Sequence, residues 1–301
     1  EMCIRDSTII EQKATDKDGK IFFTADLPVG GSFYVKEVKA PAGFVTTEEI
    51  KEFTFEYAGE DVPEVTFEYT FENEATIFEI TKSDLTTGEE LPGAKLEVTD
   101  QDGNVVDAWT SGTEPHIIKE LEVGKEYTLT ETLPADGYVT AESITFTVED
   151  TAKSQKIEMK DDVTKVEISK TDISGKELPG AKLTILDKDG KTVESWTSEE
   201  KPHYIEMLPI GEYTLREESA PDGYLVAEDV KFTVEDTGEI QKVVMKDEVK
   251  PEETPTPETP STQVTDTPKT GDNTHMLLWI LLAVAGMAGS VSAFWIAKKR
   301  K

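Results

Sequence analysis

Three charged residues recur at fixed places in a repeated pattern of alternating strands, each at a position where an apolar side chain is expected. Lys82, Glu131 and Asp161 each have the same parity as the apolar residues beside them. Because successive side chains of a strand point to opposite faces, each charge is predicted to face the core that its apolar neighbours form. A second set has the same property: Lys170, Glu217 and Asp247.

Burial would change the chemistry of these groups, because it disfavours their charged forms. It lowers the pKa of a lysine and raises the pKa of a carboxylic acid. A neutral amine is a nucleophile, a protonated carboxyl is an electrophile, and a neighbouring glutamate can move the proton between them. The product would be an amide between two side chains, with loss of water, or of ammonia where the acceptor is asparagine. The alternative is a buried salt-bridge network without covalent closure, since an unpaired buried ion costs several kcal/mol.

The strands that must position these groups belong to a repeated unit of about ninety residues. Lys82 and Lys170 lie 88 positions apart, and Glu131 and Glu217 lie 86 apart. Short alternating runs separated by glycine- and proline-containing turns predict an all-β fold of tandem sandwich modules. The predicted boundaries are 75–162 and 163–249 for two complete units, after a truncated copy at 1–74.

The first copy is expected to hold only the back half of the unit, with its opening strands missing. Its match to the repeats begins near Ala14, and Met2–Ser7 match nothing in them. A last strand is predicted over 65–73, where aromatic residues alternate. Glu37 and Asn73 occupy the glutamate and acceptor positions. The matching lysine would lie upstream of residue 1, so no amide is expected to form in this copy.

The C-terminal part changes character after residue 249. Residues 250–266 are rich in Pro, Thr and Glu, which predicts a disordered, solvated linker. Residues 276–297 are 22 uncharged residues, enough for one transmembrane helix. The basic tail 298–301 is expected to stay on the cytoplasmic side of the membrane.

Composition excludes several classes of function. The chain has 31 Lys and Arg against 62 Asp and Glu, a net charge of −31, which argues against nucleic-acid binding. Its one cysteine, Cys3, excludes a disulfide framework. Asp-x-Asp-Gly segments such as Asp100–Gly103 lack the rest of a calcium loop and are interpreted as hairpin turns. His116 and His203 have no clustered Cys or second His, so neither a metal nor a cofactor is predicted.

The motifs of the two complete repeats resemble a known domain family. K-x-D, L-P-G-A-K-L, Y-T-L-x-E, D-G-Y and M-K-D follow one another as in the collagen-adhesin B-type (SpaA-like, prealbumin-like) domains of Gram-positive surface proteins and pilins. The resemblance covers roughly residues 14–248. It implies an Ig-like or prealbumin-like β-sandwich with an intramolecular isopeptide bond in each complete repeat. The implied sets are Lys82–Asp161 assisted by Glu131, and Lys170–Asp247 assisted by Glu217.

The end of the chain, residues 267–301, resembles a sortase sorting signal. The motif precedes the apolar helix and basic tail, as in L-P-x-T-G signals, with threonine in place of the first leucine. The resemblance implies that sortase cuts after Thr270 and joins this residue to a peptidoglycan cross-bridge amine. The alternative is a simple C-terminal membrane anchor. The motif residues are Thr267, Pro268, Lys269, Thr270 and Gly271.

Together these features predict a secreted, cell-wall-anchored stalk, either pilin-like or the stem of an adhesin. Its expected partners are sortase, the peptidoglycan amine and, before sorting, the membrane through the C-terminal helix. Two alternatives stay open: the β-domains themselves bind a host extracellular-matrix protein or glycan, or a head upstream carries the activity. The chain is not expected to be an enzyme, because an internal amide forms once and consumes its own side chains.

Overall fold

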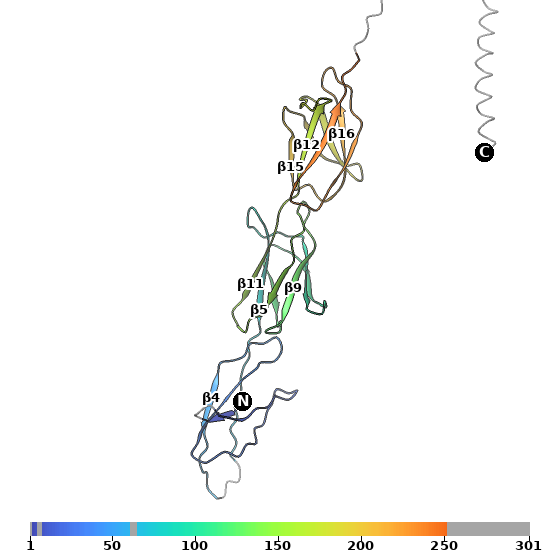
Figure 1. Ribbon diagram of the computed structural model, residues 1–301. Coiled ribbons are helices and arrows are strands. Elements are labelled where there is room, and N and C mark those ends of the chain that lie inside the picture. Colours follow the sequence, from blue (N-terminus) through green and yellow to red (C-terminus); the bar gives the residue numbers. More distant parts are fainter. Residues whose placement is uncertain (1, 5–7, 61–64, 252–301) are drawn as a thin grey trace, which may run out of the picture. The chain divides into compact units, whose positions relative to one another are not determined.

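The computed structural model describes residues 2–4, 8–60 and 65–251, all within one compact unit that ends at Pro251 (Figure 1). In this part of the chain every assigned element is a β-strand, and no helix there is long and apolar enough to cross a membrane. The all-β prediction is confirmed for these residues. The predicted linker from residue 252 onwards, the sorting motif, the transmembrane helix and the basic tail lie outside the described residues. We call the three repeats the first, middle and last modules.

The middle module is a sandwich of two sheets. One sheet has the strand order β11-β5-β8 and the other the order β10-β9-β6-β7. Its first and last strands pair in parallel, while all other pairs within the module are antiparallel. The strands are β5 (Ile77–Asp84), β6 (Lys95–Asp100), β7 (Val105–Thr110), β8 (His116–Lys119), β9 (Glu126–Leu133), β10 (Ile144–Thr147) and β11 (Gln155–Asp161).

The last module repeats this topology strand for strand. Its sheets have the orders β15-β12-β18 and β14-β13-β16-β17, and again the first and last strands pair in parallel. The equal topology explains why the two sequences keep their motifs in register. The strands are β12 (Lys165–Asp172), β13 (Lys182–Asp187), β14 (Thr192–Thr197), β15 (His203–Glu206), β16 (Gly211–Ser219), β17 (Val230–Val234) and β18 (Ile240–Asp247).

The first module has one sheet, of order β2-β1-β3-β4. By their place beside β3, the first two strands are the counterparts of β6 and β7, so the module begins earlier than the sequence match near Ala14 suggests. The strand predicted over 65–73 is wrong, since no ladder forms there. The strand that would pair with it is the counterpart of β5, which the described residues do not supply. The strands are β1 (Met2–Ile4), β2 (Ile9–Glu11), β3 (Ser32–Lys36) and β4 (Ile50–Thr54).

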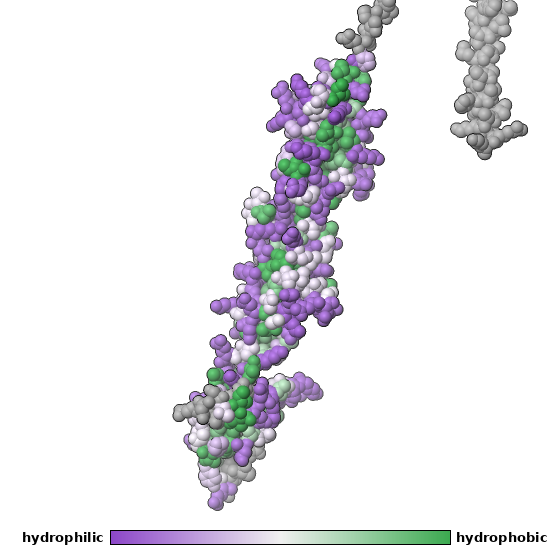
Figure 2. All heavy atoms as spheres, in the orientation of Figure 1, coloured by the Kyte–Doolittle hydropathy of each residue, from purple (hydrophilic) through white to green (hydrophobic). Residues whose placement is uncertain are grey.

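Each complete module has its own hydrophobic core between its sheets. In the middle module Ile80 from β5 and Leu129 from β9 are 2% and 0% exposed and belong to one buried cluster. Trp109 packs against that cluster, and Trp196 packs against the equivalent core of the last module. These contacts agree with the strict alternation of the sequence. The surface in Figure 2 is largely hydrophilic over the middle module, consistent with the high acidic content.

The Asp-x-Asp-Gly segments of the two complete modules form hairpin turns, as interpreted from the sequence, because they join the paired strands β6 and β7, and β13 and β14. Asp100 Oδ1 accepts hydrogen bonds from the backbone amides of Asp102 at 2.9 Å and Asn104 at 2.8 Å. Gly103 has a φ of 81°, a left-handed conformation that glycine adopts without steric cost. The carboxylate is therefore held by the turn itself, as in an Asx turn.

A buried serine that follows β7 hydrogen-bonds to the segment that leads into β6, and this contact can be tested by substitution. Ser111 Oγ donates to the carbonyl of Leu91 at 2.6 Å and accepts from the amide of Ala94 at 2.9 Å. Ser111→Ala should lower the free energy of unfolding by about 1–3 kcal/mol, because both backbone groups lose a partner. Urea denaturation measures this loss. The exposed Ser143→Ala should change stability by less than about 0.5 kcal/mol, and equal effects would contradict the assignment.

Candidate functional site

Three strands bring the predicted residues of the middle module together. Lys82 is on β5 and Asp161 on β11, the parallel neighbour of β5. Glu131 comes from β9 in the opposite sheet and faces them across the core. The register between β6 and β9 shifts beside this residue, since Leu96 pairs with Glu131 while Lys95 pairs with Leu133. Such a bulge re-aims a side chain near a functional site.

The three charged side chains meet inside the sandwich. Lys82, Glu131 and Asp161 are 2%, 4% and 1% exposed. The Lys82 amine contacts Asp161 Oδ1 directly and lies 2.8 Å from Glu131 Oε1. Glu131 Oε2 accepts a hydrogen bond from the backbone amide of Ala141 at 2.7 Å. One carboxylate oxygen is therefore fixed by the backbone while the other is turned to the amine.

The last module contains the same arrangement. The Lys170 amine contacts Asp247 Oδ1 and lies 3.0 Å from Glu217 Oε1. Glu217 Oε2 accepts a hydrogen bond from the amide of Ala227 at 2.7 Å. These three side chains are 2%, 0% and 4% exposed for the lysine, aspartate and glutamate. The register shift beside the glutamate is also repeated, between Lys182 and its neighbour on β13.

Each cluster has one amine for two carboxyl groups, which leaves it short of positive charge. In the described part of the chain, Asp161 Oδ2 and Asp247 Oδ2 are buried without a hydrogen-bond partner, and Glu131 Oε1 and Glu217 Oε1 have only the ion pair with the lysine of their cluster. Burial raises the pKa of Asp161 to about 7, and it raises the pKa of Asp247 in the same direction. A proton on the acceptor carboxyl therefore becomes accessible near neutral pH, which is the state that an amine can attack.

The first module contains a partial version of the site. Glu37 Oε2 accepts hydrogen bonds from Asn73 Nδ2 at 2.6 Å and from the amide of Thr47 at 2.9 Å. Asn73 Nδ2 also donates to the carbonyl of Val45 at 2.9 Å. The structure thus brings the predicted glutamate and acceptor together. No counterpart of β5, the strand that carries the lysine in the other modules, is present among the described residues.

Sequence reasoning missed the backbone amide that holds each glutamate. The donors are Thr47, Ala141 and Ala227, each ten residues after the glutamate of its module. This constant spacing is visible in the sequence, but the donor is a main-chain group and its residue type varies. The predicted sortase residues, from Thr267 to Gly271, lie outside the described residues.

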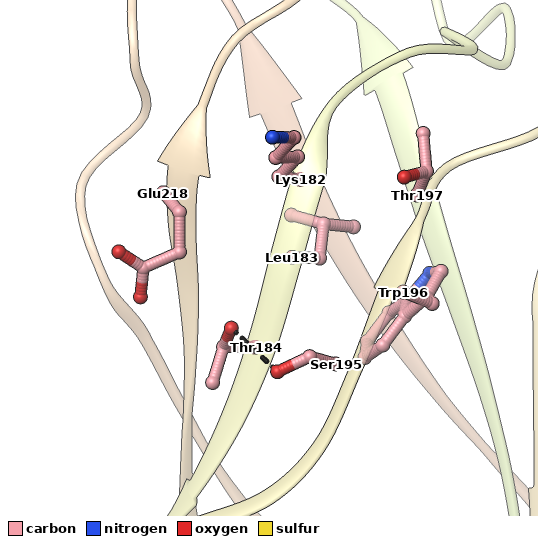
Figure 3. Close-up of a pocket in the computed structure, with 7 residues that line it drawn as sticks. All are labelled: Lys182, Leu183, Thr184, Ser195, Trp196, Thr197 and Glu218. Atoms are coloured by element: carbon pink, nitrogen blue, oxygen red, sulfur yellow. Dashed lines mark hydrogen bonds between the residues drawn. The ribbon is translucent and has the colours of Figure 1, made fainter.

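A shallow hollow on the last module is separate from the buried clusters. It measures about 350 Å³ and lies on the outer side of β13, β14 and β16 (Figure 3). Thr184 and Ser195, which line it, hydrogen-bond to each other at 2.9 Å. No group of three or more His, Cys, Asp or Glu that could hold a metal occurs among the described residues.

Removing the lysine should make the middle module less stable as the pH rises. Lys82→Met takes away the contacts that lower the pKa of Asp161, so this pKa moves further above its value of 3.8 in the unfolded chain. A carboxyl with a raised folded-state pKa stabilises the fold below its unfolded pKa, and that stability is lost as the pH rises through the folded pKa. Calorimetry from about pH 4 to pH 9 should show the loss, at most about 1.4 kcal/mol per pH unit.

The matched control is the double variant Lys82→Met/Asp161→Asn, which keeps Glu131 but removes the titrating acceptor. Its stability should depend less on pH than that of the single variant. Equal pH slopes in the two variants would show that Asp161 is not the group that titrates.

Solved structures similar to this chain come from Gram-positive surface proteins and pilins. The Bacillus anthracis TIE protein is 30% identical, with a TM-score of 0.45; the match covers 77% of this chain and 44% of that one. The shaft pilin SpaA from Lactobacillus rhamnosus GG is 14% identical, with a TM-score of 0.30; the match covers 57% of this chain and 97% of that one. The minor pilin GBS52 from Streptococcus agalactiae is 13% identical, with a TM-score of 0.29; the match covers 62% of this chain and 100% of that one. This chain spans less than half of the TIE protein structure.

A family model assigns the modules more directly. No curated protein matches the chain, but the model of the SpaA prealbumin-like fold domain matches it three times in succession. The matched stretches are residues 3–70, 76–163 and 164–249, which together cover most of the chain. The chain therefore belongs to the family of proteins built from tandem SpaA prealbumin-like domains.

Proposed function

We propose that the chain is a cell-wall-anchored surface stalk, pilin-like or the stem of an adhesin, whose two complete modules are each closed by an autocatalytic Lys–Asp amide. The buried contact of each lysine with its aspartate, beside a glutamate held by the backbone, carries this proposal. The family assignment and the pilins among the similar structures support the stalk role.

The proposed bond joins Lys82 Nζ to the side-chain carbonyl carbon of Asp161. A proton first passes from the ammonium group to the carboxylate, which leaves a neutral amine facing a neutral acid. The amine then attacks the carbon, and Glu131 takes the extra proton from nitrogen and gives it to the departing hydroxyl. The C–O bond breaks, water leaves, and the amide remains. Lys170, Glu217 and Asp247 have the same roles in the last module.

The fold supplies what this reaction needs without a separate enzyme. The two reacting groups are already in contact, so no further order has to be imposed on them. Their burial removes the water that would stabilise the ion pair against the neutral pair. The two residues joined in the middle module lie 79 positions apart in the sequence. On the chain-entropy account used for disulfides, such closure stabilises a module by roughly 4–5 kcal/mol.

Attachment to the wall is the second part of the proposal. The segment from Thr267 to Gly271 precedes 22 uncharged residues and a basic tail. We assign to sortase the cleavage of the bond after Thr270 and the transfer of its carbonyl to a peptidoglycan cross-bridge amine. The helix would hold the chain in the membrane until this transfer occurs.

Intact mass spectrometry of residues 75–249 tests the two amides. The expected mass is lower than the sequence mass by two waters, because each closure releases one. Lys82→Ala and Lys170→Ala should each restore one water and lower the melting temperature. Lys95→Ala, at an exposed position on β6 of the opposite sheet, should leave both losses intact. A mass equal to that of the sequence would exclude the amides and leave two buried salt-bridge networks.

Fractionation of cells that make the full chain tests the anchoring. Thr270→Ala is expected to move the protein from the wall to the detergent-soluble membrane fraction, because the acyl transfer needs the native motif. Lys269→Ala changes the variable position and should stay attached to the wall. If the unaltered chain is already extracted by detergent with its C-terminal helix intact, the segment is a simple membrane anchor.

A further inference from the structure

The same backbone contacts recur at both boundaries between modules. The amide of Thr76 donates to the carbonyl of Gly43 at 3.0 Å at the first boundary, and Thr164 donates to Gly137 at 3.0 Å at the second. Each glycine belongs to the turn that follows the glutamate strand of the preceding module. No spacer separates the modules, because residues that pair with this turn lead directly into the next lysine strand.

A residue with an unusual backbone conformation meets each of these turns. Glu120 and Met207, 87 positions apart, are the only non-glycine residues with positive φ in the described part of the chain, at 65° and 61°. Such conformations are costly and persist only where the surroundings hold them. The amides of Glu120 and Met207 donate to the carbonyls of Thr76 at 3.1 Å and Thr164 at 3.0 Å. Both strained residues therefore lie at module boundaries.

The fit between turn and strained residue excludes any side chain on the turn glycine. A Cβ atom on Gly137 would lie 2.5 Å from the carbonyl oxygen of Met207. A Cβ atom on Gly43 would lie 2.6 Å from the carbonyl oxygen of Glu120. Both distances are shorter than van der Waals contact allows, so the backbones meet as closely as glycine permits.

A carboxylate from the following module adds a second repeated contact. Asp150 Oδ1 accepts from the amide of Thr46 at 2.9 Å, across 104 positions. Asp236 Oδ1 accepts from the amide of Thr140 at 2.8 Å, across 96 positions. The two aspartates are equivalent in their modules. The contact therefore belongs to the repeat and not to one boundary.

The last module has the same turn, but the described residues contain no module after it. Gly223 has a φ of 87°, nearly that of Gly137 at 86°, and a Cβ atom there would meet no atom of the described residues within 4 Å. Val249 is 61% exposed, whereas its counterpart Val163 is 9% exposed. Because the two turns have the same backbone conformation, the close contact at Gly137 and the burial of Val163 come from the module that follows.

We propose that the glycine turn of each module is a docking surface for the strained loop and the aspartate of the next module, so that neighbouring modules move as one body. The partner is thus another SpaA-type module. It must have a residue of positive φ directly before its Leu-x-x-Gly loop, and further along an aspartate that accepts a hydrogen bond from the preceding module. This interaction is independent of the amides in the two cores, and it extends the proposed stalk from single modules to their joints.

Amide hydrogen exchange in residues 1–251, the compact unit, tests the docking. Gly137→Ala should speed the exchange of the Thr140 and Met207 amides roughly tenfold. The Thr140 amide donates to Asp236 across the boundary between the two modules, and the Met207 amide holds the strained residue that packs against Gly137. Exchange at Leu129 in the core should not change. Gly223→Ala carries the same φ strain but meets no neighbour within residues 2–4, 8–60 and 65–251, so it should leave the exchange of the Thr140 and Met207 amides unaffected. Equal effects of the two variants, or none from Gly137→Ala, would overturn the proposal.

A second pair of variants tests the aspartates one joint at a time. Asp236→Ala should speed exchange at Thr140 and leave Thr46 unchanged, and Asp150→Ala should do the reverse. NMR relaxation should give one tumbling time for the middle and last modules in the unaltered protein and two different times in Asp236→Ala. Separate tumbling times in the unaltered protein would contradict docking even if both core amides are present.

Discussion

The constraint on which each complete module depends is a single amine buried against two carboxyl groups. Removing three such groups from water costs several kcal/mol each, and one ammonium cannot balance two carboxylates. The structure reduces the imbalance in two ways. The backbone amide of Ala141 holds Glu131, and burial raises the pKa of Asp161 towards neutrality. A site that is unstable as a set of ions is well suited to become a neutral amide, so the electrostatic problem and the proposed chemistry have the same origin.

The placement of these groups could be predicted because strand alternation is a strong signal. Lys82, Glu131 and Asp161 have the parity of buried neighbours, and all three are buried. The strand expected over 65–73 failed for a different reason: alternation reports which face is apolar, but a strand also needs a ladder partner. The bulge beside Glu131 and the left-handed φ of Met207 are backbone features that residue types do not encode directly. The bulge becomes visible only in the register of the paired strands, and the left-handed conformation only in the backbone angles.

The site and the joint share one segment of chain. Asp161 ends the last strand of the middle module, Val163 pairs with the turn of that module, and Lys170 lies in the first strand of the last module. The same few residues therefore supply an acceptor, a boundary contact and a nucleophile. An insertion or deletion between Asp161 and Lys170 would therefore disturb both hydrophobic cores and the contact between the two modules. This constraint is consistent with the nearly constant spacing of the motifs.

The parallel pairing of first and last strands has a mechanical consequence. Tension applied along the chain enters a module through β5 and leaves through β11, so it shears all the ladder bonds of that pair together instead of opening them one by one. With the proposed amides in place, the load passes from Lys82 directly to Asp161 and then along nine peptide bonds to Lys170. The chain between Lys82 and Asp161, which lie 79 positions apart and could span about 270 Å when fully extended, would carry none of it. Such a stem would transmit a pull without lengthening.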